Sequence, residues 1–216
     1  MKRTLLSIVA MIAFVSATHG QIKLGVKAGA NRSNLLSGDE DVDVDAKMGF
    51  HFGGYIDLSL SEKFSIQPEL VYSTQGAKSE YSETVEDVGF VFSYSSESKV
   101  KLDYLNIPVL FKFKPAEIFY IGGGPQLGIL LSAKHEYSTT FVGSGVSESE
   151  SGQEDVKDEL NAIDLSLAIG AGIELENGLN FGIRYNYGIS DVADENDGDP
   201  IRNSVLQASV GYTILK

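Results

Sequence analysis

The sequence predicts an all-β protein, an eight-stranded antiparallel up-and-down transmembrane β-barrel. Apolar residues recur at every second position in eight segments, which is the spacing of β-strands. Very short turns and long acidic loops alternate between these segments, as in barrels of bacterial outer membranes. The two longest arms reach the roughly 9 to 11 residues that a tilted strand needs to cross a bilayer. No helical period interrupts this pattern, and an open sheet edge would leave backbone groups unpaired in lipid, so closure is expected.

The first twenty residues have the features of a secretory leader. Lys2 and Arg3 precede an apolar run from Leu5 to Val15, and small residues follow before Gln21. An N-terminal membrane anchor is the alternative, but the run is shorter than the ~20 residues that a spanning helix requires. We therefore expect a signal peptide over residues 1–20 and one barrel domain over residues 21–216.

Three strands are predicted at the start of the barrel domain, over residues 22–31, 47–60 and 64–76. A tight turn, LSEK at 60–63, joins the second to the third. Each strand has large apolar side chains on one face and small or polar ones on the other. The apolar faces hold Ile22, Leu24, Val26, Met48, Phe50, Phe52, Ile56, Leu58, Phe64, Ile66, Leu70 and Tyr72.

A long hairpin over residues 101–134 supplies the fourth and fifth strands. Its turn is only Pro115, Ala116 and Glu117. One face is apolar and the other carries Tyr, Asn, Gly, Gln and Lys. The apolar face holds Leu105, Ile107, Val109, Phe111, Phe113, Phe119, Ile121, Pro125, Leu127, Ile129 and Leu131.

The last three strands are predicted over residues 163–174, 180–190 and 206–214. Glu176, Asn177 and Gly178 form the turn between the first two, because Asn-Gly is a strong hairpin signal. The same alternation holds in all three. The apolar positions are Ile163, Leu165, Leu167, Ile169, Ala171, Ile173, Phe181, Ile183, Tyr185, Tyr187, Ile189, Leu206, Ala208, Val210, Tyr212 and Ile214.

Long polar segments separate these strands. Most acidic residues lie in four of them, at 33–46, 77–99, 133–159 and 191–203. The stretch at 133–159 is so rich in Ser, Gly and acids that it cannot bury enough surface to order itself, so a mobile loop is expected there.

The charge balance and the absence of cysteine exclude several classes. The net charge is −13, from 17 basic and 30 acidic residues, and nucleic-acid partners require basic surfaces. Without cysteine there are no disulfides, thiol nucleophiles or cysteine zinc sites.

Alternation alone allows either polarity, because a soluble lipocalin-like barrel puts apolar residues inside and a membrane barrel puts them outside. The polar face here consists mostly of Gly, Ser, Asn and Gln, which suits a small filled interior. Aromatic residues also gather near strand ends, where membrane barrels have interfacial girdles. They are Phe64, Tyr72, Phe113, Phe119, Tyr185, Tyr187 and Tyr212. We therefore favour lipid outside.

An eight-stranded barrel is about wide enough for its own side chains, so a water-filled pore is not expected. Charges of both signs fall on the inner face, and buried charges need partners. We expect Glu69 to lie close to Lys112 or Arg184, with Asp57 and Asp164 as further members of the ion pairs. A structural plug of ion pairs is favoured over a role in conduction or gating.

Several segments carry a family resemblance: QPELVYSTQGAK at 67–78, KLDYLNIPVLFKF at 101–113, FYIGGGPQLGILLSAK at 119–134 and ELENGLNFGIRYNYGISDV at 174–192. Together and in this order they resemble the PorT-like family of outer-membrane β-barrels. The resemblance implies a porin-like barrel of eight strands, whose namesake is linked to a protein-secretion apparatus. It supplies no catalytic residues. One departure is the C-terminus, which ends in Ile214, Leu215 and Lys216 instead of an aromatic residue.

No constellation for catalysis, metal or cofactor binding is visible. His51 is expected inside the barrel as a hydrogen-bonded residue, and Gly122 to Gly124 precede more strand instead of a phosphate-binding helix. The acidic stretches 39–45 and 194–199 lack the spacing of a calcium loop, so a solvated acidic rim is favoured over cation binding.

The sequence therefore predicts a non-enzymatic protein of the outer membrane of a Gram-negative bacterium, with a structural or interaction role that includes an accessory role in protein export. Its expected partners are outer-membrane lipid and proteins at the long acidic loops, without nucleic acid and without cofactors. A small porin, a soluble lipocalin-like binder and a membrane-embedded hydrolase remain alternatives.

Overall fold

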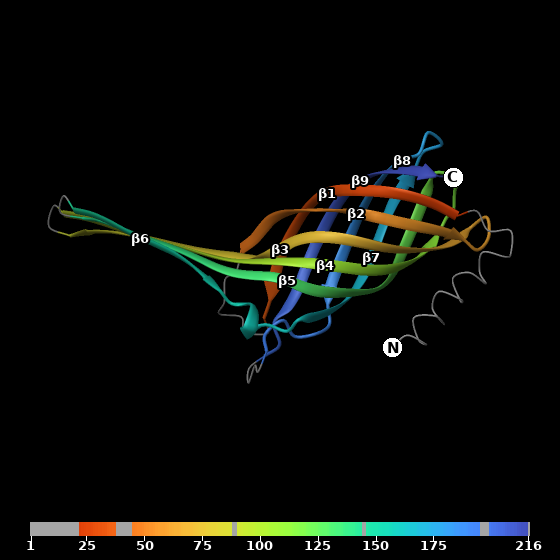
Figure 1. The fold of residues 1–216 in the computed structure, drawn as a ribbon. Helices are drawn as coiled ribbons and strands as arrows, with labels where there is room; N and C mark the ends of the chain where they lie inside the picture. The colour runs from red at the N-terminus through yellow and green to blue at the C-terminus, as the bar shows by residue number, and fades with distance from the viewer. Residues whose placement is uncertain (1–21, 38–44, 88–89, 144–145, 195–198, 216) are drawn as a thin grey trace.

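The computed structural model describes residues 22–37, 45–87, 90–143, 146–194 and 199–215. The predicted signal peptide lies outside these ranges. The described residues form an all-β structure with one short 3-10 helix (Figure 1). The elements are β1 (Ile22–Leu36), β2 (Asp45–Ser59), β3 (Phe64–Asp87), β4 (Phe90–Phe113), β5 (Phe119–Gly143), β6 (Val146–Asp155), η1 (Lys157–Glu159), β7 (Ile163–Glu174), β8 (Leu179–Gly188) and β9 (Arg202–Leu215). Within these ranges no helix has the length and apolarity that crossing a bilayer requires.

Eight of the strands close a barrel. Their order around it is β1, β2, β3, β4, β5, β7, β8, β9, and every neighbouring pair is antiparallel. β9 returns to β1, where Val210 faces Ala28 and Tyr212 faces Val26. The predicted eight-stranded antiparallel barrel is therefore confirmed. β6 lies outside the ring, and its one partner in the described part of the chain is the far part of β5.

Two of the predicted loops are wrong. Residues 77–87 and 90–99 continue β3 and β4 as paired strands, and most of 133–159 forms the end of β5 and all of β6. The ends of β3, β4 and β5 leave the barrel together, and β6 joins them to form a narrow twisted sheet (Figure 1). The low apolar content of these segments favours loops, but Tyr, Thr, Phe and Val also alternate with polar residues along them, which is the pattern of strands. The hydrogen-bond ladders that begin in the barrel also continue without a break into this sheet, so little burial is needed to extend it.

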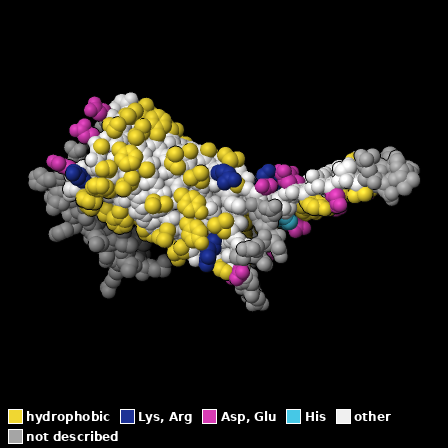
Figure 2. Space-filling view, turned by 180° about the vertical axis from the view of Figure 1, so that it is seen from behind, with side chains coloured by type: hydrophobic (Ala, Val, Ile, Leu, Met, Phe, Trp, Pro, Cys, Tyr) yellow, Lys and Arg dark blue, Asp and Glu magenta, His cyan; other side chains and the backbone are white. Residues whose placement is uncertain are grey.

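The outside of the barrel is apolar and the inside is polar. Ile169 is 67% exposed and Ile183 63%, and apolar side chains cover the barrel wall in the space-filling view (Figure 2). Aromatic rings cluster toward the strand ends, as between Phe64 and Phe113, whose ring centroids are 5.1 Å apart. A lipocalin-like barrel would have the opposite polarity, so this arrangement fits lipid outside.

Glycines are needed at two kinds of position. Gly178 has φ +96° in the turn between β7 and β8, a conformation that costs glycine little. Gly25 instead lies under the ring of Tyr55, and a methyl group there would overlap that ring and approach the backbone oxygen of Tyr212 to 2.7 Å. Gly178 therefore allows the tight turn, and Gly25 leaves room for the inward-facing ring of Tyr55.

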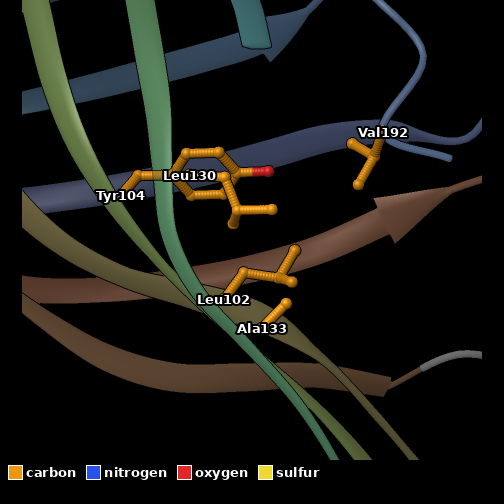
Figure 3. Packing of buried hydrophobic residues seen from close by; sticks show 5 residues of the cluster. All are labelled: Leu102, Tyr104, Leu130, Ala133 and Val192. Atoms are coloured by element: carbon orange, nitrogen blue, oxygen red, sulfur yellow. The ribbon is translucent and has the colours of Figure 1, made fainter. Parts of the chain in front are cut away.

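An apolar cluster fills the barrel end from which the sheet projects. Leu102, Tyr104, Leu130, Ala133 and Val192 are buried together (Figure 3). Tyr104 lies opposite Leu130 in the regular register of β4 and β5, and a register shift between Asp103 and Tyr104 then sets Leu102 opposite Ala133. The loop before β9 contributes Val192, so chain segments far apart in sequence close this end.

Candidate functional site

The barrel interior is crossed by an ionic network whose first centre is Glu69 on β3. Both of its oxygens accept hydrogen bonds from Arg184 on β8, at 2.6 and 2.9 Å. Lys27 on β1 donates to the same carboxylate at 3.0 Å, and Gln67 donates at 2.7 Å. The Glu69 side chain is completely buried. One carboxylate therefore joins three strands across the lumen.

The second centre is Lys112 on β4. Its ammonium group donates to Asp57 on β2 at 2.9 Å, to the Gln67 side-chain oxygen at 2.9 Å, and to Glu174 on β7. The same ammonium lies 4.1 Å from the centre of the Tyr120 ring. Because Gln67 contacts both centres, Glu69 and Lys112 belong to one network.

The predicted ion-pair residues lie at three positions in the lumen. Glu69 lies against Arg184, and Lys112 lies against Asp57 instead of Glu69. Asp164 is elsewhere in the lumen and accepts hydrogen bonds from Ser166 at 2.7 Å and Ser190 at 3.2 Å. Glu174 on β7 lies between Lys112 and Lys114, a position that follows only from the barrel closure.

Little free space remains beside this network. The cavity lined by Lys27, Tyr55, Lys112 and Arg184 has a volume of about 30 Å³, enough for about one or two water molecules. Farther along β4, the apolar cluster around Leu102 fills the end of the barrel from which the sheet projects. Two different barriers therefore lie in series along the barrel.

A polar triplet in the lumen was not found from the sequence. The two ring nitrogens of His51 lie 2.8 Å from the Ser209 hydroxyl and 2.7 Å from the Asn31 side-chain oxygen. This order of groups resembles a nucleophile, a base and an orienting residue. However, His51 is 1% exposed and Asn31 is fully buried. The Ser209 hydroxyl that faces His51 is on the side of the small cavity, although residue 209 also borders a groove lined by apolar residues such as Phe119 and Phe181. The three residues are on β2, β9 and β1, so only the closed barrel brings them together.

The described residues contain no group of three His, Asp or Glu side chains placed to hold a metal ion. Most of the two acidic stretches, 39–45 and 194–199, falls outside those residues. The solvated acidic rim expected at these two stretches therefore stays a prediction from the sequence.

The projecting sheet is the other feature that the structure adds. We use this name for residues 77–87, 90–100, 134–143 and 146–155, which pair in the order β3, β4, β5, β6. β2 pairs with β3 only up to Lys78. Among the described residues no strand pairs with the outer edge of β6. The sheet therefore offers two faces and two strand edges outside the barrel.

Ion pairs on this sheet shift the ionisation of its carboxylates. The hydrogen bond from Lys101, at 2.6 Å, lowers the pKa of Glu136. Lys78 lowers the pKa of Glu80 in the same way. Tyr81 donates to Glu83 at 2.7 Å, and this bond raises the pKa of the Tyr81 hydroxyl. These surface groups are thus held in defined pairs.

A comparison with family models gives a match over residues 16–194, to a family described as "Outer membrane protein beta-barrel domain". Among solved structures, Ail of Yersinia pestis is 14% identical, with 89% of this chain and 98% of that chain covered and a TM-score of 0.43. OprG of Pseudomonas aeruginosa is 10% identical (92% and 98% covered, TM-score 0.40), and Neisserial surface protein A is 15% identical (88% and 97% covered, TM-score 0.39). No curated protein matches the chain.

Proposed function

The chain belongs to the family of outer-membrane β-barrel domains, and from this premise we propose that it anchors the projecting sheet in the outer membrane for interaction with another protein. The barrel supplies the anchor through its apolar outer wall. The sheet supplies the working surface, because its strands extend well beyond the barrel (Figure 1).

The observation that carries the proposal is the pairing of four strands outside the barrel. In the register, β4 and β5 remain paired from the barrel out to Phe92 and Gly143. Paired backbone holds a surface in a defined shape, so a partner would lose little conformational entropy on meeting it.

A small porin is the competing function, and the filled interior argues against it. A solute would have to pass both the ionic network and the apolar cluster around Leu102. Planar-bilayer recordings of the purified protein should therefore show no regular conductance steps. Steps that persist across preparations would favour the porin instead.

The test of the interaction role shortens the sheet without touching the barrel. Residues 80–97 and 138–151 are each replaced by a two-residue Asn-Gly turn, which suits a hairpin of this kind. The shortened protein should still show heat-dependent migration on gels, while photo-crosslinks from its remaining sheet to neighbouring proteins in intact cells should disappear. A matched control keeps the sheet and carries Leu60→Ala in the opposite turn. Crosslinks that survive the deletion would overturn the proposal.

Finer parts of the proposal come from the sequence. The resemblance to PorT-like barrels supports an accessory role in protein export, in a Gram-negative bacterium and after removal of a signal peptide over residues 1–20. Mass spectrometry of the mature N-terminus tests that cleavage. Loss of secretion on deletion of the gene, restored by the full chain, tests the export role.

A non-enzymatic role is also part of the proposal, although the Ser209, His51 and Asn31 geometry favours a hydrolase as the second candidate. An ester would need access that the water-sized cavity denies. A fluorophosphonate probe should thus leave the folded protein unlabelled, and labelling that Ser209→Ala removes would instead support the hydrolase.

A further inference from the structure

The two faces of the projecting sheet differ in composition. Side chains alternate between faces along each strand, and residues opposite each other in the register share a face. Tyr81 and Tyr94, with ring centroids 6.2 Å apart, therefore lie on one face. Thr84 and Ser93, which are hydrogen-bonded at 3.2 Å, lie on the other.

The first face, which we call the aromatic face, continues the inner wall of the barrel into solvent. Tyr81 is 56% exposed, Tyr94 41% and Phe141 39%. Tyr137 lies farther down the same face and covers Gly152 on β6, where any larger side chain would collide with its ring. Exposed rings in one row are uncommon on a surface that meets only water.

Charge is also divided between the faces. The carboxylates of Glu83, Glu148, Glu150 and Glu154 are on the aromatic face, and no lysine or arginine is among its described side chains. Among its described side chains the opposite face carries as many carboxylates, but they are matched by lysines. Its described charges are Lys78, Glu80, Glu97, Lys99, Lys134, Glu136 and Asp155, together with Lys101 where β4 enters the barrel. Two salt bridges form within a strand, Lys78–Glu80 and Lys99–Glu97, and a third joins Lys101 to Glu136 on the neighbouring strand.

We propose that the aromatic face is a docking surface for a cationic protein segment, one that presents arginine or lysine side chains in a row. Such cations stack on tyrosine rings and meet carboxylates that have no lysine or arginine on the described part of their own face. Arginine suits the site best, since its planar group both stacks and binds carboxylates through two hydrogen bonds. This inference rests on the proposed interaction function and names the face and the chemistry of the partner.

Charge also excludes two other occupants. A second copy of this chain would bring an equally acidic face against the first, and like charges repel. A polyanion such as nucleic acid would meet the same repulsion. Addition of a strand at the edge of β6 is a different mode, because it uses backbone groups and does not depend on the aromatic face.

The test uses the full chain in nanodiscs of zwitterionic phosphatidylcholine, and a fluorescent decapeptide of alternating arginine and serine as the probe. A decapeptide of alternating glutamate and serine is the control probe. Fluorescence anisotropy gives the dissociation constants at two salt concentrations. Binding of the arginine peptide that weakens with salt, without binding of the glutamate peptide, is the expected result.

Two sets of isosteric variants separate the face from overall charge. The first set is Glu83→Gln, Glu148→Gln and Glu150→Gln on the aromatic face. The matched set is Glu80→Gln, Glu97→Gln and Glu136→Gln on the opposite face, which changes the net charge equally. The first set should weaken the arginine peptide at least tenfold and the matched set less than twofold.

Substitution of the rings gives an independent readout. Tyr81→Ser combined with Tyr94→Ser leaves every charge in place and should also weaken binding severalfold. Equal weakening by both glutamine sets, or absence of binding by the arginine peptide, would overturn the inference. If the sheet interacts through another surface, its crosslinks to neighbouring proteins in cells would remain even though the arginine peptide does not bind the aromatic face. Failure of this inference can therefore be told apart from failure of the proposed interaction function, which would also abolish the crosslinks.

Discussion

Glu69→Gln is the substitution that examines the filled interior most sharply. Glutamine has almost the same volume as glutamate, so the change removes a charge without opening a cavity. The native carboxylate accepts two hydrogen bonds from Arg184, one from Lys27 and one from Gln67. After the substitution two buried cations lose their shared counter-charge.

The expected cost follows from this geometry. Loss of one partner from a buried ion pair costs about 3–5 kcal/mol, because the remaining charge is left without compensation. For a protein of this size, each kcal/mol lowers the melting temperature by roughly 2–4 °C. Glu69→Gln should therefore unfold at least about 6 °C earlier by these estimates.

Urea unfolding in phosphatidylcholine vesicles, followed by the gel shift between folded and unfolded forms, measures the free energy of unfolding. Glu148→Gln on the exposed sheet is the matched control and should change it by no more than about 0.5 kcal/mol. Glu69→Gln combined with Arg184→Gln should lose less than the sum of the single variants, since the pair is removed together. An unchanged stability of Glu69→Gln would refute the structural plug, and new conductance in that variant would favour gating.

Three further outcomes are expected. Gly25→Ala should destabilise the barrel, because the added methyl group would overlap the Tyr55 ring. Gly54→Ala should be nearly neutral, since the nearest atom to its added methyl group is 3.5 Å away. The urea midpoints of the two variants compare these costs, and equal midpoints would contradict the packing of Gly25 against Tyr55. Leu102→Ala should cost about 2–5 kcal/mol by leaving a cavity in the apolar cluster, and wild-type stability would show that the cluster is not packed. The hydrogen bond from Lys101 lowers the pKa of Glu136. The stability that this ion pair contributes is therefore present above the ordinary pKa of glutamate and is lost as the pH falls through the lowered pKa. NMR titration of Lys101→Met should show a higher pKa for Glu136, and an unchanged pKa would exclude the ion pair.

Much of the barrel could be predicted from the sequence because alternation is a local property. Each strand face, such as the one with Leu165, Leu167 and Ile169, is readable within a few residues. The polar interior is readable in the same way, because Glu69 and Arg184 occupy the alternate positions of their strands that face away from the apolar side. Their contact across the lumen depends on how the sheet closes, which no local pattern contains.

The projecting sheet was missed because composition and alternation gave conflicting signals. Residues 133–159 are too polar to form a core, but strands that continue an existing ladder do not need one. The alternation of Tyr137, Thr139 and Phe141 was the signal that could have found it. The full apolar cluster is not readable from alternation for another reason: the register shift between Asp103 and Tyr104 turns Ala133 inward, against the alternation that places Leu130 inside.

The central claim is that the apolar wall faces lipid while the projecting sheet is in water. The chain has no tryptophan, so Ile169→Trp and Tyr81→Trp each provide a single fluorophore, on the wall and on the sheet. In vesicles of brominated phosphatidylcholine, the tryptophan at 169 should be strongly quenched by the lipid and unaffected by aqueous iodide, and the one at 81 should behave in the opposite way. Quenching at 169 by iodide without quenching by the brominated lipid would contradict the claim.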